Sequence, residues 1–224
     1  MTLRQTLESL FKKTPIHYPI RKWLRRQQWL QERQVRNWER QGKPGPAPHL
    51  VKQRVLQHYA DRYRLRILVE TGTYYGDMIE AMKGAFDRIY SIELGAKFYE
   101  KAKQRFKSDP HVELILGDSG RELGGVMREI GVEPALFWLD GHYLPGSAQG
   151  DKDTPIYDEL DQILDAPEAA HVIIIDDARC FGADPAYPTI VELEGYILAR
   201  RANAHIGIED DMIRITPAVI GSTK

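Results

Sequence analysis

Blocks of apolar residues alternate with amphipathic blocks from about residue 50 to residue 216. Short, nearly continuous apolar runs predict strands that are buried on both faces, at 66–70, 88–93, 111–116, 135–139 and 171–175. Between them, apolar residues spaced by three and four predict helices, at 50–63, 76–85, 95–107, 119–130 and 154–164. Strands that alternate with helices favour a parallel sheet covered on both faces, which is a doubly wound α/β fold.

The last part of this region follows a different pattern. A predicted helix at 188–201 is followed by two short alternating segments, His205 to Glu209 and Met212 to Thr216. Asp210 and Asp211 lie between them and suit a tight turn, so we expect an antiparallel hairpin. With the five parallel strands, this hairpin completes a predicted seven-stranded sheet.

The first 49 residues form a separate pattern that predicts one long basic amphipathic helix. No helix breaker occurs from Pro19 to about Gln41, and apolar residues form a single stripe there, made of Ile20, Trp23, Leu24, Leu30, Val35 and Trp38. Basic residues occupy the other side. The stripe could pack on the protein's own body, on a homodimer mate or on an anionic membrane surface. A nucleic-acid partner is disfavoured because no aromatic platform or nucleic-acid module is present.

A run rich in proline and glycine, 42–48, ends this helix and predicts a linker. We therefore expect a helical extension with its linker over 1–49 and a cofactor-binding domain over 50–224. The extension carries 11 Lys/Arg and 3 Asp/Glu, a net charge of +8, whereas the remainder carries 20 and 29, a net charge of −9.

The 224 residues, 42% of them hydrophobic, are enough for one substantial core. No apolar run approaches the roughly 20 residues that span a bilayer, and the N-terminus lacks the apolar block of a secretory signal. We expect a cytoplasmic protein, and the single Cys180 cannot form an internal disulfide.

The turn after the first predicted strand of the domain predicts a nucleoside-cofactor site. Glu70-Thr71-Gly72-Thr73-Tyr74-Tyr75-Gly76 joins a strand to a helix, and Glu93 follows Glu70 by 23 residues, where an acid can accept ribose hydroxyls. The glycine spacing is G-x-x-x-G rather than the G-x-G-x-x-G of dinucleotide sites, with Tyr74 at the middle position. Because Glu70 would repel phosphate and attract a cation, S-adenosylmethionine suits the loop better than NAD.

Acidic residues follow every parallel strand, and the carboxyl ends of such strands share one edge of the sheet. They are Glu70, Glu93, Asp118, Asp140, Asp176 and Asp177. Because these carboxylates repel one another, we expect cations to neutralise their charge. A sulfonium would neutralise part of it and a divalent ion the rest. Asp140, Asp176 and Asp177 form a hard oxygen set that suits Mg²⁺. Alternatively, Asp176 and Asp177 cap a helix or pair with Arg179, and Asp118 with Ser119 caps the next helix.

His142 follows the fourth strand beside the predicted metal site. An imidazole with an ordinary pKa near 6.5 suits a general base there. A metal ligand and a structural hydrogen-bond donor are the competing roles.

These motifs together resemble those of class I S-adenosylmethionine-dependent methyltransferases, over about residues 60–216. The resemblance rests on Glu70 to Gly76, Glu93, Gly117-Asp118-Ser119 and Leu139-Asp140-Gly141. The Gly-Thr-Tyr variant is similar to the metal-dependent O-methyltransferases of the catechol type. Leu-Asp-Gly followed by Ile-Asp-Asp resembles the macrocin and novobiocin sugar O-methyltransferases, which implies Mg²⁺ ligation by Asp140, Asp176 and Asp177. The sequence departs from that family at His142, where an aspartate is expected.

The resemblance implies a Rossmann-like O-methyltransferase that acts on a hydroxyl of a small molecule or saccharide. Residues of the first motif would hold the methionine end of the cofactor: Glu70, Thr71, Gly72, Thr73, Tyr74 and Gly76. Glu93 would bind the ribose, Asp118 with Ser119 the adenine, and Asp140 would serve both cofactor and metal. The alternatives are a macromolecular or lipid-linked acceptor and a non-catalytic S-adenosylmethionine-binding protein.

Overall fold

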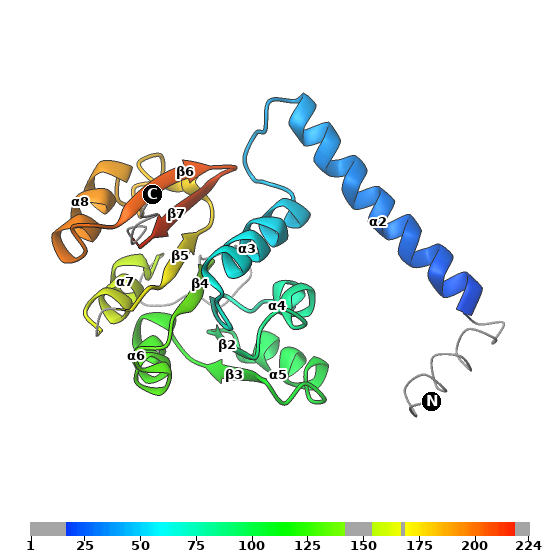
Figure 1. Cartoon of the computed structure of the whole chain (residues 1–224), viewed down its shortest axis with the longest axis horizontal. Coiled ribbons are helices and arrows are strands. Elements are labelled where there is room, and N and C mark those ends of the chain that lie inside the picture. Colours follow the sequence, from blue (N-terminus) through cyan, green and yellow to red (C-terminus); the bar gives the residue numbers. More distant parts are fainter. Residues whose placement is uncertain (1–16, 142–153, 167–168, 218–224) are drawn as a thin grey trace, which may run out of the picture.

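The computed structural model describes residues 17–141, 154–166 and 169–217, which form a seven-stranded sheet between two layers of helices (Figure 1). The strands lie in the order β3-β2-β1-β4-β5-β7-β6. They are β1 (Ile67–Thr71), β2 (Arg88–Glu93), β3 (Val112–Leu116), β4 (Ala135–Leu139), β5 (Val172–Ile175), β6 (His205–Glu209) and β7 (Met212–Thr216). Strand β7 runs antiparallel to both of its neighbours, β5 and β6, and the other neighbouring strands pair in parallel. The predicted doubly wound sheet with a C-terminal hairpin is confirmed.

The helices lie where the apolar spacing predicts them, although four of them are each two or more residues shorter than expected. They are α2 (His17–Arg40), α3 (His49–Tyr63), α4 (Asp77–Met82), α5 (Ala96–Arg105), α6 (Ser119–Ile130), α7 (Ile156–Leu164), the 3-10 turn η1 (Ala178–Cys180) and α8 (Ile190–Arg200). The shorter ones are α4, α5, α7 and α8. Helix α4 ends at Met82 rather than at residue 85, since Gly84 follows closely and glycine is a poor helix former.

Two cores form because alternate residues of each buried strand face opposite sides of the sheet. In β1, Ile67 and Val69 join a core with helices α6, α7 and α8. Leu68 joins the other core, with α3, α4, α5 and the end of α2. Near-continuous apolar strands are therefore needed, because both faces of the sheet are covered.

The hairpin between β6 and β7 turns at Asp210 and Asp211, which have φ values of 54° and 62°. Two successive residues with positive φ give a turn whose twist matches that of the flanking strands, and aspartate tolerates this conformation. The two acids in the predicted turn are thus in the conformation that their position requires.

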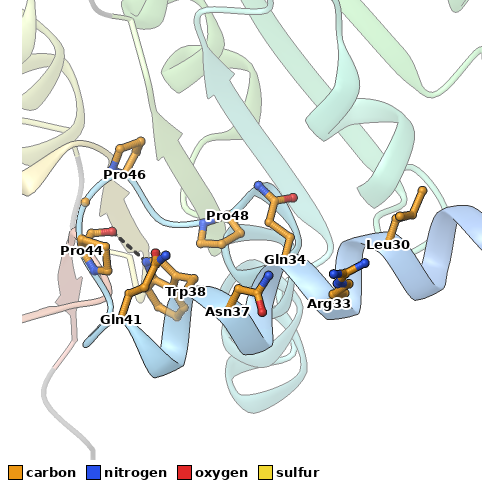
Figure 2. Close-up of a pocket in the computed structure, with 10 residues that line it drawn as sticks. Leu30, Arg33, Gln34, Asn37, Trp38, Gln41, Pro44, Pro46 and Pro48 are labelled. Atoms are coloured by element: carbon orange, nitrogen blue, oxygen red, sulfur yellow. Dashed lines mark hydrogen bonds between the residues drawn. The ribbon is translucent and has the colours of Figure 1, made fainter.

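Helix α2 stands apart from the body over most of its length (Figure 1). Among the stripe residues whose side chains are described, Val35 and Trp38 near the end of the helix are buried and join the core of α3, whereas Trp23 and Leu30 are exposed. Trp38 Nε1 donates to the carbonyl oxygen of Pro44 at 2.7 Å. A groove of about 480 Å³ lies between this end of α2 and the linker (Figure 2). The packing on the body that the stripe predicts is therefore partial.

Nearer the start of α2, Trp23 and Trp29 are 58% and 53% exposed. A homodimer mate and an anionic membrane surface stay predicted partners for this part of the helix. Among the helices in the described ranges, none is long and apolar enough to cross a bilayer.

The linker lies against the hairpin turn and η1. The Lys43 ammonium pairs with Asp210 at 2.8 Å. Gly45 approaches so closely that a Cβ there would lie 2.6 Å from Asp211 Oδ2 and 2.9 Å from Arg179 Cδ. The linker thereby fixes the start of α3, which follows at His49.

Candidate functional site

The candidate site lies where the strand order reverses, between β1 and β4, the usual ligand crevice of an open α/β sheet. Backbone bonds continue the ladder past the strand ends. The N–H of Gly72 donates to Ile92 at 2.9 Å, and that of Gly117 to Glu93 at 3.0 Å. On the other side, Asp140 donates to Thr71 at 3.2 Å and Asp176 to Leu139 at 3.0 Å. These bonds hold the residues that follow neighbouring strands side by side.

The turn after β1 depends on a glycine at its first position. Gly72 has φ +84°, and a Cβ on it would lie 2.3 Å from the carbonyl oxygen of Asp140. No other residue fits there without separating the ends of β1 and β4. The Thr73 hydroxyl lies 2.6 Å from the Ser91 hydroxyl, which ties the turn to β2.

Tyr74, at the position of the middle glycine of dinucleotide sites, has φ +50°, an uncommon conformation for tyrosine. Its ring packs on those of Tyr75 and Phe98, with centroid distances of 4.3 and 4.7 Å. The side chain is thus part of an aromatic cluster at the surface, and the backbone N–H of Tyr74 donates to Glu93.

Glu93 is held by two backbone N–H groups. Its Oε2 accepts from Tyr74 and its Oε1 from Gly95, both at 2.7 Å. Each carboxylate oxygen keeps a further lone pair, so the oriented carboxylate can still accept two hydroxyls of a ribose.

Glu70 is buried beneath the turn, where the Ser91 hydroxyl donates to its Oε2 at 2.6 Å. Burial raises the pKa of Glu70 to about 8, although the bond from Ser91 opposes the shift. The carboxyl is therefore largely protonated at neutral pH in the protein alone. A cationic ligand would favour its ionised form.

Asp118 and Ser119 begin helix α6. Asp118 accepts from the Gly120 N–H at 2.9 Å, so the capping role that the sequence allows is present. Ser119 donates to Glu159 of α7 at 2.5 Å. Glu159 is buried and was not predicted as a site residue. Burial raises its pKa to about 7, against the effect of the Ser119 bond.

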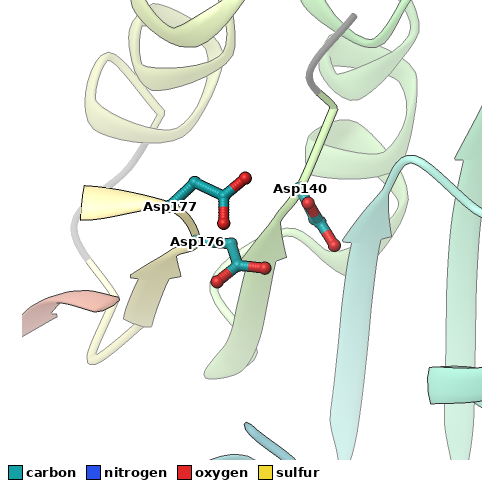
Figure 3. A group of neighbouring side chains, drawn as sticks. All are labelled: Asp140, Asp176 and Asp177. Atoms are coloured by element: carbon teal, nitrogen blue, oxygen red, sulfur yellow. The ribbon is translucent and has the colours of Figure 1, made fainter. Parts of the chain in front are cut away.

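The three aspartates after β4 and β5 come together as the sequence predicts (Figure 3). Asp140, Asp176 and Asp177 each offer a carboxylate oxygen, and these oxygens lie within 4.8 Å of one another. Asp176 is 1% exposed, and its Oδ1 is buried without a hydrogen-bond partner. An unsatisfied buried oxygen next to two further carboxylates fits a hard cation such as Mg²⁺.

Two cations of the protein itself reach the same aspartates. Lys52, in the first turn of α3, forms an ion pair with Asp176. Arg179 pairs with Asp177 at 2.6 Å and also with Asp211. Of the two alternatives for Asp177, the pair with Arg179 is present, whereas its side chain makes no capping hydrogen bond to η1, the 3-10 turn that follows it. The acids are thus partly neutralised by the protein's own cations, of which the sequence indicates Arg179 but not Lys52.

The pKa values of this group follow from burial and mutual charge. Burial, and next the charge of Asp176, raises the pKa of Asp140 well above its usual value. Burial alone would lower the pKa of Lys52, but the carboxylates of Asp176, Asp140 and Asp177 outweigh it and raise the pKa. Lys52 therefore stays charged. The predicted base, His142, lies outside the described residues.

Comparison with known proteins finds likeness in structure rather than in sequence. No family model and no curated protein sequence matches the chain. The O-methyltransferase TomG from Streptomyces achromogenes, involved in tomaymycin synthesis and solved with S-adenosylmethionine, superposes with a TM-score of 0.54 and 19% identity. The match covers 84% of this chain and 89% of TomG.

Two further solved methyltransferase structures resemble the chain to a similar degree. A putative caffeoyl-CoA O-methyltransferase from Staphylococcus aureus has a TM-score of 0.52 and 13% identity, over 87% of this chain and 98% of that one. The N-methyltransferase NodS from Bradyrhizobium japonicum has a TM-score of 0.52 and 12% identity, over 75% and 94%. Oxygen and nitrogen acceptors thus both occur on this architecture. The chain has the class I S-adenosylmethionine-dependent methyltransferase fold.

Proposed function

We propose that this protein is an S-adenosylmethionine-dependent O-methyltransferase that acts on a hydroxyl of a small molecule or saccharide, with a divalent ion, most simply Mg²⁺, at Asp140, Asp176 and Asp177. The observation that carries the proposal is the meeting of these three carboxylates beside the G-x-x-x-G turn. A cation site and a nucleoside site then share one crevice at the switch point of the sheet.

The cofactor would lie along the turn after β1. Glu70 and residues 71–76 would hold its methionine end, with the Glu70 carboxyl facing a positive charge. Glu93, already oriented by two backbone N–H groups, would accept the ribose hydroxyls. Ser119 donates its proton to Glu159, so its remaining lone pairs are free to accept from an adenine amino group.

Asp140, Asp176 and Asp177 would hold the divalent ion, which when bound lowers the pKa of an acceptor hydroxyl and fixes its orientation. The unsatisfied Oδ1 of Asp176 supports this assignment. Holding the acceptor at a fixed angle to the methyl group is the larger expected contribution, because orientation can supply up to roughly 7–11 kcal/mol of a barrier.

In the transfer, a bond forms between the acceptor oxygen and the methyl carbon. The bond from that carbon to sulfur breaks, and its electron pair stays on sulfur. The hydroxyl proton passes to a base, for which His142 is the candidate from the sequence. Its contribution stays a prediction.

The test is calorimetry of S-adenosylmethionine and of NAD, each with and without Mg²⁺, followed by an assay for S-adenosylhomocysteine with catechol and sugar acceptors. We expect S-adenosylmethionine to bind, NAD to bind weakly or not at all, and Mg²⁺ to increase turnover. Preferential binding of NAD would overturn the proposal. Cofactor binding without any turnover would favour a non-catalytic protein.

A matched pair of variants assigns the cofactor site. Glu70→Gln should weaken S-adenosylmethionine binding, because the neutral amide cannot balance a cation. Glu113→Gln changes an exposed glutamate of β3 and should leave the affinity unchanged. Binding by residues 17–40 that weakens steeply with salt would favour the alternative of an anionic macromolecular or lipid-linked acceptor.

A further inference from the structure

Lys52 occupies an unusual place for a lysine. It lies in the first turn of α3, where the helix dipole disfavours a positive charge. Its side chain is 14% exposed, and its ammonium lies 5.8 Å from the centroid of the Trp138 ring. A charge that is this far removed from water requires strong partners.

Those partners are the same carboxylates that the proposed function gives to a divalent ion. Asp176 pairs directly with Lys52 through Oδ2, while Oδ1 has no partner. The charges of Asp140 and Asp177 also act on the lysine. Lys52 therefore partly neutralises an aspartate whose other oxygen is buried without a hydrogen-bond partner.

We infer that Lys52 is a built-in counter-ion of the aspartate cluster, which stabilises the metal-free protein and competes with a divalent cation for Asp176. The inference rests on the proposed function, since it takes the three aspartates to be the ion's ligands. Repulsion between an ammonium and a divalent ion that share one carboxylate is strong in a site shielded from water. The competition thus lowers the affinity of the whole protein for Mg²⁺.

Magnesium chloride titrated calorimetrically into the full-length protein and its variants tests this. Lys52→Met removes the charge and keeps much of the side-chain volume, so we expect Mg²⁺ to bind at least about tenfold more tightly. Lys52→Arg keeps the charge and should bind Mg²⁺ no more tightly than the unmodified protein. Lys83→Met is the matched control, because Lys83 pairs with Glu80 and Asp109 away from the cluster.

Thermal unfolding gives a second readout that does not depend on turnover. Without Mg²⁺, Lys52→Met should unfold at a lower temperature than the unmodified protein, since Asp176 loses its partner. Saturating Mg²⁺ should raise its unfolding temperature by more than it raises that of the unmodified protein.

Mg²⁺ binding by Lys52→Met that is no tighter than that of the unmodified protein would overturn the inference, and so would absence of binding in both. A separate titration of S-adenosylmethionine into the unmodified protein without Mg²⁺ tests the proposed function. If the cofactor fails to bind, the methyltransferase proposal falls. If it binds, and Mg²⁺ binds both proteins but Lys52→Met no more tightly, only the role of Lys52 falls.

Discussion

Glu70 and Ser91 are partners in register on β1 and β2, and the serine hydroxyl donates to the glutamate at 2.6 Å. A single neutral donor is a weak counterpart for a buried carboxylate. The pKa of Glu70 is therefore raised from 4.5 to about 8, with burial as the main cause. As long as no cationic ligand is bound, a neutral side chain suits this buried position better than a carboxylate.

Replacing Glu70 should consequently stabilise the protein. The folded state keeps the Glu70 proton up to about pH 8, whereas the unfolded chain loses it near pH 4.5, so stability falls as pH rises between these values. Relative to the unmodified protein, Glu70→Gln should gain a few kcal/mol at pH 8, with ~5 kcal/mol as the upper bound, and little at pH 4.5. Urea unfolding at the two pH values measures this. An equal gain in stability at both pH values would show that the pKa of Glu70 is not raised in the folded protein.

His171 predicts a pH effect of the opposite sign. Burial, and next the charge of Arg201, lowers its pKa from 6.5 to about 4, and its Nδ1 accepts from the Ala135 N–H at 3.1 Å. The unfolded chain takes up a proton below pH 6.5 that the folded protein resists, so this contribution is lost as pH falls from 6.5 to 4.

The variant His171→Asn keeps an acceptor but cannot titrate. Its stability relative to the unmodified protein should improve by up to about 3 kcal/mol between pH 7 and pH 4. Parallel denaturant titrations of the two proteins give this difference directly, because the other titratable groups contribute equally to the pH dependence of both proteins. A constant difference across that range would contradict the pKa shift of His171.

Gly72→Ala should damage the turn and the cofactor site together. The residue has φ +84°, and the added Cβ would meet the Asp140 carbonyl oxygen at 2.3 Å. We expect a loss of ~1–3 kcal/mol of stability and a large loss of S-adenosylmethionine affinity. Gly195→Ala is the control, since nothing lies within 4 Å of its Cβ position in helix α8. This control should gain about 0.5–1 kcal/mol.

Trp38 should anchor the end of α2 to the body. It is 7% exposed and donates to Pro44, whereas Trp29 is 53% exposed. Trp38→Ala should therefore speed proteolytic cleavage within residues 41–48, and Trp29→Ala should not. Mass spectrometry of limited digests locates the cuts. Equal cleavage rates in both variants would argue against the anchor.

The periodicity of apolar residues predicts nearly the whole sheet, because buried parallel strands and their covering helices leave distinct patterns. Strands β2, β4, β6 and β7 begin and end at the predicted residues. The acids that meet at the site were also predictable, since each lies at or within two residues of the end of a parallel strand, and these strand ends share one edge of the sheet. The division at residue 49 and the roles of the cofactor-binding residues stay predictions.

Lys52 and Glu159 escaped the prediction because they enter the site from helices rather than from strand ends. A signal was nevertheless present. Lys52 lies three and four residues before the buried Val55 and Leu56. Glu159 lies between the buried Ile156 and Ile163 at the same spacing. A charged residue on the apolar stripe of a helix needs a buried partner, and the sequence alone does not identify that partner.

The close packing of Gly45 on Arg179 and Asp211 bears on how a shortened version of this protein should be designed. A fragment that starts at His49, a natural choice for crystallisation, would uncover Arg179 and release Asp210 from Lys43. The guanidinium that balances Asp177 would then be free to rearrange. Ion affinities measured on such a fragment would describe an aspartate cluster with different surroundings from those in the full-length protein.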